Sequence, residues 1–154
     1  MRQTESINPA WAAHRIREKQ VQQRGLALIA ARQGAESASL VESRNLDLVW
    51  QEAVFRQNSK INTARTGQSV LIESSQTTII PAFRRFVAQT RTRLILQFEL
   101  PYAVIVVISD PDAFMASLLA QRRTRDWTLF CDHPRAVFDI QEREYKVVLF
   151  IDIE

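Results

Sequence analysis

Apolar residues follow two different spacings along the second half of the chain. Short apolar runs, typical of buried strands, occupy residues 70–72, 94–100, 102–108 and 127–131. Between them, residues 79–87 and 114–119 place apolar side chains three or four positions apart, as on one face of a helix. The resulting order is β-α-β-β-α-β, which predicts the split βαβ arrangement.

The second of these helices has a clear start signal. Asp110 can cap it, Pro111 suits the first helical position, and Asp112 adds a negative charge near the positive helix end. We expect this helix to run to about Arg125. After a turn at His133, residues 137–140 and 145–153 predict a C-terminal hairpin.

Two further helices are predicted in the N-terminal part. Residues 8–33 begin with Asn8 as a cap and Pro9 at the first helical position, while Gly25 predicts a kink or a break, at a cost of about 1 kcal/mol relative to alanine. Residues 37–58 show helical spacing of apolar side chains around Trp50, which predicts the second helix. A polar stretch over residues 57–68 then separates the helices from the strands.

Together these patterns predict an α+β fold, with a mostly antiparallel sheet of five to six strands. Its β-α-β-β-α-β core carries a C-terminal hairpin and is preceded by two N-terminal helices. We expect one domain over residues 1–154, with a helical layer at 1–66 and a sheet portion at 67–154, because a lone helix pair buries too little surface. The internal helices should cover one face and the N-terminal helices the other face or an edge. The expected core residues are Trp50, Phe83, Phe86, Ile105, Val107, Phe114 and Leu118.

The composition indicates the cellular compartment in which the protein is expected. The single cysteine, Cys131, cannot form an intramolecular disulfide, which favours a reducing environment. The N-terminus lacks the apolar core of a signal peptide, and the most apolar stretch, residues 94–108, is shorter than a membrane-spanning helix. We therefore expect a cytoplasmic protein without membrane contact.

Arginine supplies most of the positive charge in a chain whose net charge is +3. If the two internal helices run the same way, their C-terminal ends meet at one edge of the sheet. Cations there offset the helix dipole, yet three arginines at the end of the second helix exceed what the dipole explains. We therefore predict a partner-binding arginine edge, suited to an acidic protein or to phosphate. It consists of Arg84, Arg85, Arg91, Arg93, Arg122, Arg123 and Arg125.

A metal-dependent nuclease is a further hypothesis. Glu144-Tyr145-Lys146 has the Glu-x-Lys spacing of many restriction-type nucleases, and Asp132 or Asp139 would have to supply the second carboxylate. Asp139 lies too close in sequence to come from a properly spaced preceding strand.

Two other groups of polar residues predict ordinary structure. Cys131, Asp132 and His133 are adjacent, so they cannot all face one metal ion, and a buried cysteine at a strand end is expected. Asp152 and Glu154 are typical of a solvated strand end. The sequence contains no glycine-rich phosphate loop and no nucleophile elbow. We predict no catalytic site, no metal and no cofactor.

The leading functional hypothesis is a small non-enzymatic interaction protein, such as an immunity or antitoxin-like inhibitor or an accessory subunit. It would bind a macromolecular partner through the arginine edge. Nucleic-acid binding through the same edge is the first alternative, and a metal-dependent nuclease is the second. A homo-oligomer is also possible on this sequence. A β-α-β-β-α-β order by itself implies no function.

Overall fold

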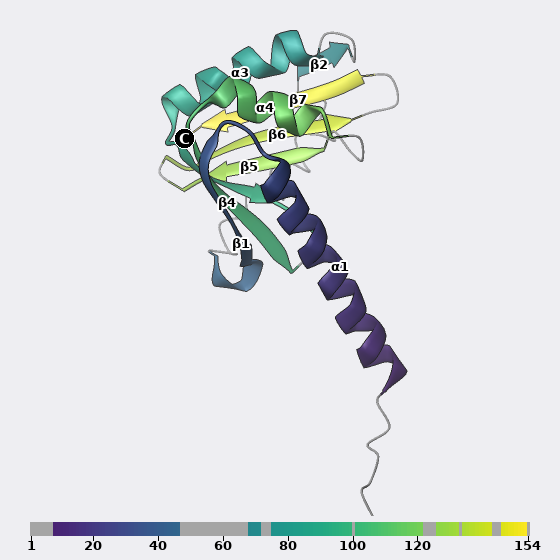
Figure 1. Cartoon of the computed structure of the whole chain (residues 1–154). Helices are drawn as coiled ribbons and strands as arrows, with labels where there is room; N and C mark the ends of the chain where they lie inside the picture. The colour runs from purple at the N-terminus through teal and green to yellow at the C-terminus, as the bar shows by residue number, and fades with distance from the viewer. Residues whose placement is uncertain are drawn as a thin grey trace, which may run out of the picture.

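The computed structural model describes residues 8–46, 68–71, 75–99, 101–121, 126–132, 134–142 and 146–153. The chain begins with α1 (Pro9–Ala31), β1 (Ala35–Glu42) and a 3-10 turn, η1 (Ser43–Asn45). It continues with β2 (Gln68–Leu71), α3 (Ser75–Gln89), β3 (Arg93–Gln97), β4 (Tyr102–Ile108) and α4 (Pro111–Leu119). It ends with β5 (Trp127–Cys131), β6 (Ala136–Glu142) and β7 (Lys146–Ile153) (Figure 1). The fold class is α+β, as predicted.

The described strands form a single antiparallel sheet in the order β1-β4-β3-β5-β6-β7-β2. The predicted order of elements from β2 to β5 is confirmed, but the split βαβ arrangement is wrong. That arrangement would place β2 between β4 and β5. Both edges of each of these strands are already taken, since β4 lies between β1 and β3, and β5 lies between β3 and β6. β2 therefore pairs with β7 at the far edge.

The start of the predicted second helix is a strand. β1 pairs with β4 along its whole length, from Ala35 opposite Ile108 to Glu42 opposite Tyr102. Along β1, Ala38 and Leu40 face the helix-covered core while Val41 belongs to a cluster on the other face, which is the alternation of a strand. Pairing with β4 overrides the local helical spacing, so the N-terminal part adds a strand to the sheet. The remainder of the predicted helix, including Trp50, lies outside the described residues.

The main core lies between the sheet and the two helices α3 and α4 (Figure 1). Phe83 of α3 packs against Phe114 of α4 and Phe138 of β6, with ring centroids 5.9 and 5.2 Å apart. Phe86 completes the cluster, 5.4 Å from Phe138. These four rings are almost fully buried, as is Leu118. The core prediction is confirmed for Phe83, Phe86, Phe114 and Leu118.

Two predicted core residues of β4 are only half-buried. Ile105 and Val107 point to the face opposite the helices, where Ile105 joins a smaller apolar cluster. Their neighbours Val104, Val106 and Ile108 occupy the main core instead. A run that is apolar on both faces does not reveal which face is better covered, and that explains the error.

The C-terminal part of α1 packs on the same face as α3 and α4, since Leu28 and Ile29 join the main core. The N-terminal helices were expected to cover the other face or an edge, and α1 contradicts only the first part, since it lies on the same face as α3 and α4, over the edge strand β1 and its neighbour β4. The helix is not broken at Gly25. A Cβ at that position would lie 2.7 Å from Leu40 Cδ1, so the glycine permits close approach to β1. Within the described residues, no helix has the length and apolar character needed to span a membrane.

The turn from α1 to β1 is anchored on the start of α4. Gly34 adopts a left-handed φ of 70°, and its carbonyl accepts hydrogen bonds from the backbone N–H groups of Ser109 and Asp110, both at 2.9 Å. A Cβ on Gly34 would lie 2.2 Å from the Asp110 carbonyl oxygen. Only glycine satisfies both the backbone conformation and the close approach.

Replacing Phe114 with alanine should destabilise the protein by about 3–5 kcal/mol, because the lost ring leaves a cavity between α3, α4 and the sheet. Ile16→Ala is the control, since Ile16 is 57% exposed on α1, and its cost should stay within about 0.5 kcal/mol. Equilibrium denaturation in urea measures both. A Phe114→Ala cost as small as that of the control would contradict the packed aromatic core.

Gly34→Ala should destabilise the protein by more than Gly25→Ala does. At Gly34 the added Cβ meets backbone atoms that cannot yield, and the left-handed φ adds strain. At Gly25 it meets the ends of the flexible Leu40 and Phe98 side chains, and alanine gains about 1 kcal/mol of helix propensity. Thermal unfolding of the two variants gives the order, and the reverse order would contradict this account of the turn.

Candidate functional site

The helices α3 and α4 run in opposite directions. α3 leads into β3, α4 follows β4, and β3 and β4 are antiparallel. The C-terminus of α3 therefore lies at the end of the sheet where α4 begins. The prediction that both helices run the same way is wrong, because each helix doubles back along the strand to which it is joined and those two strands are opposed. The C-terminal ends of the two helices therefore do not meet at one edge of the sheet, and the geometric reason for a shared arginine edge no longer holds.

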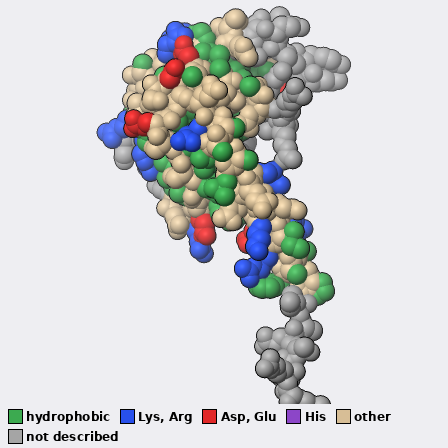
Figure 2. Space-filling view, viewed as in Figure 1, with side chains coloured by type: hydrophobic (Ala, Val, Ile, Leu, Met, Phe, Trp, Pro, Cys, Tyr) green, Lys and Arg blue, Asp and Glu red, His purple; other side chains and the backbone are tan. Residues whose placement is uncertain are grey.

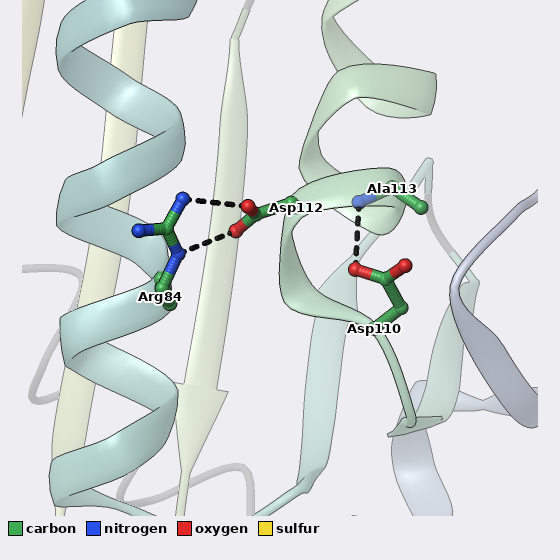
Figure 3. A network of polar contacts seen from close by, with 4 residues as sticks. All are labelled: Arg84, Asp110, Asp112 and Ala113. Atoms are coloured by element: carbon green, nitrogen blue, oxygen red, sulfur yellow. Dashed lines mark hydrogen bonds and ion pairs between the residues drawn. The ribbon is translucent and has the colours of Figure 1, made fainter.

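Some of the predicted edge residues form ion pairs within the chain. Arg84 forms a two-pronged ion pair with Asp112, with Nε to Oδ1 at 2.8 Å and Nη2 to Oδ2 at 2.6 Å (Figure 3). Arg93 Nη1 lies 3.8 Å from Asp132 Oδ2. Arg85 and Arg91 are exposed.

The other predicted edge residues, Arg122, Arg123 and Arg125, lie outside the described residues, and the described part of α4 ends at Leu119 rather than at about Arg125. Partner binding by the arginine edge stays a prediction.

The Arg84 pair belongs to the start of α4. The Asp110 carboxylate caps this helix by accepting the Ala113 N–H at 3.2 Å, and Asp112 lies in the first turn (Figure 3). The hydrogen bond from Arg84 is the main cause that lowers the pKa of Asp112, and the same bond raises the pKa of Arg84. This pair links α3 to α4 and explains Arg84 without a partner.

The residues of the nuclease hypothesis are only partly described. Glu144 lies outside the described residues, and Lys146 is exposed at the start of β7. Asp139 is buried on β6, whereas Asp132 is half-buried beside Arg93. In the part of the chain that the structure describes, no three acidic, histidine or cysteine side chains gather to hold a metal ion.

The cysteine at the end of β5 is surrounded by core residues. Cys131 is buried in the main core, as expected for a strand end. His133 and Glu154 lie outside the described residues. Asp152 is half-buried opposite Val137 in the β6–β7 ladder, so it does not stand directly across from Asp139.

A cavity of about 1020 Å³ opens between α1, the end of α4 and the sheet. β3 and β5 pair only through Ile95 opposite Phe130 and Leu96 opposite Leu129. Beyond these pairs, residues 97–99 at the end of β3 and residues 126–128 at the start of β5 all line the cavity. The parting of two neighbouring strands therefore creates the hollow, and it explains why residues from both faces of the sheet line it.

A buried polar network lines one side of this cavity. Asp139 is 3% exposed and accepts hydrogen bonds from Thr128 Oγ1 at 2.7 Å and from Gln141 Nε2 at 3.0 Å. At another side, Arg24 of α1 and Glu99 form a two-pronged ion pair at 2.7 and 3.1 Å. These contacts hold the polar side chains that form them in fixed orientations at the cavity wall.

Trp127 contributes the largest aromatic wall. The residue is 6% exposed, and its indole Nε1 is buried without a hydrogen-bond partner among the described residues. Most buried donors in proteins have partners, so this atom is unusual. Nε1 has almost no accessible surface, so it is enclosed by the main core and does not face the open space of the cavity.

Sequence reasoning did not find this cavity. The one signal in the sequence is Asp139, a carboxylate within an apolar run. The other lining residues come from five separate elements, and no local pattern joins them.

Comparisons of this chain with protein-family models, with curated proteins and with solved structures find no significant match.

Asp112→Asn should reduce stability at neutral pH and make no difference in strong acid. The folded-state pKa of Asp112 lies below its usual value near 4, so the contribution is present above that value and is lost as the pH falls through the lowered pKa. Thermal unfolding of parent and variant between about pH 7 and about pH 2.5 tests this. A difference that does not change with pH would contradict the role of the ion pair.

Proposed function

We propose that this protein is a non-enzymatic binding protein that engages an acidic protein partner through residues 9–23 of α1, the helical arm. This keeps the class of function expected from the sequence and moves the contact surface from the arginine edge to the arm. The observation behind the proposal is that the arm projects away from the sheet with its side chains exposed or half-exposed (Figure 1). An inhibitor or an accessory subunit would use such a surface.

The arm exposes apolar surface that the body leaves uncovered. Trp11 is 53% exposed and Ile16 is 57% exposed, and the buried residues of α1, Gly25 and Leu28, both lie beyond the arm. Helices gain most of their stability from packing an apolar face, so an unpacked stretch of this length is only marginally stable alone. A partner that buries Trp11 and Ile16 would supply the missing packing.

The arm also carries a net positive charge. Arg15, Arg17 and Lys19 against the single acid Glu18 leave residues 9–23 with a net charge of +2. Lys and Arg side chains lie beside hydrophobic ones along the projecting helix (Figure 2). This combination favours a partner surface that is acidic at its rim and apolar within.

One pair on the arm has the composition of an interface anchor. The guanidinium carbon of Arg15 lies 4.9 Å from the centre of the Trp11 ring, within the range of a cation–π contact. Tryptophan and arginine are the residue types most enriched where binding energy is concentrated. The contact also orders both side chains before a partner arrives.

The positions of the apolar residues favour a protein groove over a flat surface. Trp11 and Ile16 are five positions apart, which places them about 140° apart around the helix. A membrane surface contacts one face of a helix, and phosphates would leave Trp11 and Ile16 exposed. A groove that encloses more than one side of the arm can bury both.

Binding should fall by about thirtyfold or more in the double variant Trp11→Ala/Ile16→Ala, as expected for the loss of interface anchors. The partner is first captured from native cell extract after nuclease treatment, identified, purified, and then titrated against each variant. Gln20→Ala/Gln23→Ala is the matched control, because both glutamines are exposed on the same helix. Its affinity should equal that of the parent.

The triple variant Arg15→Gln/Arg17→Gln/Lys19→Gln tests the electrostatic part. It should slow association and weaken the dependence of the rate on salt. Equal affinity of the parent and the Trp11→Ala/Ile16→Ala variant would refute the arm as the contact surface. Capture that is abolished by nuclease, with an affinity that falls steeply with salt, would favour the nucleic-acid alternative instead.

A further inference from the structure

We infer that the partner of the helical arm presents an acidic amphipathic helix, which lies along one face of the arm. This inference rests on the proposed function and names the element that would recognise the arm. It is drawn from the way the body of the protein already holds the C-terminal part of α1. The face concerned, the seam, consists of Trp11, His14, Glu18, Val21, Gly25 and Leu28.

The residues of the seam are alternately three and four positions apart. That spacing brings side chains to one face of a helix and is typical of the contact line between two packed helices. The two C-terminal members, Gly25 and Leu28, are buried against the body. Glu18 and Val21 are half-buried and Trp11 is 53% exposed, so the same face continues beyond the body. A helix packed along it would extend a contact that the structure already contains.

The body holds α1 through apolar contacts on the seam and an ion pair beside it. Gly25 lies against two side chains, since a Cβ there would be 2.7 Å from Leu40 Cδ1 and 3.3 Å from Phe98 Cε1. Immediately before it, Arg24 forms its two-pronged ion pair with Glu99, at 2.7 and 3.1 Å. The body thus combines an apolar surface on the seam with a carboxylate at its flank.

The arm repeats this pattern seven residues earlier. Arg17 lies seven residues before Arg24, which is almost two full turns, so both side chains flank the seam on the same side. Val21 corresponds in the same way to Leu28. Arg17 is exposed. A partner that holds the arm as the body holds α1 would therefore place an apolar side chain on Val21 and a carboxylate beside Arg17.

The middle of the seam on the arm is polar, and its two residues pair with each other. His14 Nε2 lies 3.2 Å from Glu18 Oε1, one turn along the same face. Helix pairs tolerate a polar position within an apolar seam, where it fixes the register at a cost in stability. Trp11 and Val21 lie on either side of this pair, so a partner helix would bury apolar side chains at both ends of the contact.

The charges beside the seam select the chemistry of the partner helix. Arg15 flanks the seam on one side and Arg17 on the other. In helix pairs the flanking positions choose the partner through ion pairs, so a helix with glutamates at its flanks fits both arginines. A second copy of this chain would bring the same arginines together and is disfavoured by their repulsion. Ile16 lies on the opposite side of the arm and would contact another part of the same partner.

Titration of the full chain with a synthetic peptide of about 20 residues tests the inference. The probe carries leucine at its outer seam positions, glutamine at the two central ones and glutamate at both flanking positions. It should bind saturably with a Kd below about 100 µM and gain helical circular dichroism on mixing. The same peptide with lysine at the flanking positions should bind at least about tenfold more weakly. Absence of binding by the acidic peptide, or equal binding of both peptides, would overturn the inference.

A matched pair of charge reversals tests where the partner helix lies. Arg17 and Lys19 are both exposed, but Lys19 lies about 160° from Arg17 around the arm, away from the seam. Arg17→Glu should weaken binding of the acidic peptide at least about tenfold, whereas Lys19→Glu, with the same change in charge, should weaken it less than about threefold. Equal loss in the two variants would indicate attraction by net charge alone and would overturn the inference.

Failure of the proposed function would appear differently, as unchanged affinity of the native partner for the Trp11→Ala/Ile16→Ala variant. If that variant loses affinity while Arg17→Glu and Lys19→Glu bind the native partner equally well, the arm remains the contact surface and only the partner helix is refuted.

Discussion

The short pairing between β3 and β5 is the constraint on which the rest of the structure depends. It consists of two residue pairs, Ile95 with Phe130 and Leu96 with Leu129, and it joins the ribbon β1-β4-β3 to the ribbon β5-β6-β7-β2. The ladders on either side of it, β3–β4 and β5–β6, each contain five pairs. Since so few backbone hydrogen bonds hold the two ribbons together, their union requires support from side chains.

The aromatic core provides that support. Phe114 is on α4, which follows β4 of the first ribbon, and Phe138 is on β6 of the second ribbon. Phe83 of α3 contacts both rings, so a single side chain spans the two ribbons. The ion pair of Arg84 with Asp112 adds a second link between α3 and α4 at the surface. The same brevity of the β3–β5 ladder opens the cavity at its end, so the shortest ladder of the described sheet borders the cavity.

α1 connects these two features to the exposed surface. Its C-terminal part packs on the core through Leu28 and lines the cavity with Ala27 and Ala31, while its N-terminal part extends into solvent. Gly25 permits this arrangement, because the helix approaches Leu40 and Phe98 at the point where it meets the body. One helix thus carries the proposed partner surface at one end and lines the cavity at the other.

The sequence by itself determined the features that depend on near neighbours. Asn8 and Asp110 cap their helices as expected, Pro9 and Pro111 occupy first-turn positions, and the apolar spacing of α3 and α4 places Phe83 and Phe114 inward. The hairpin of β6 and β7 was also predicted, because two apolar runs joined by a short polar stretch can pair locally.

Only the tertiary structure decided the features that depend on distant partners. Residues 37–46 have no local pattern that distinguishes a strand from a helix, and the edge of β4 selects the strand. The direction of α4 relative to α3 follows from strand order, and the strand order was decided by competition for the edges of β4 and β5. The cavity arises where a ladder ends, and the end of a ladder is set by residues far apart in the chain. Helix caps and helical apolar stripes depend on residues only a few positions apart, so a local pattern reveals them. Strand pairs and concave surfaces are formed by segments far apart in the chain, and no local pattern shows which segments will meet.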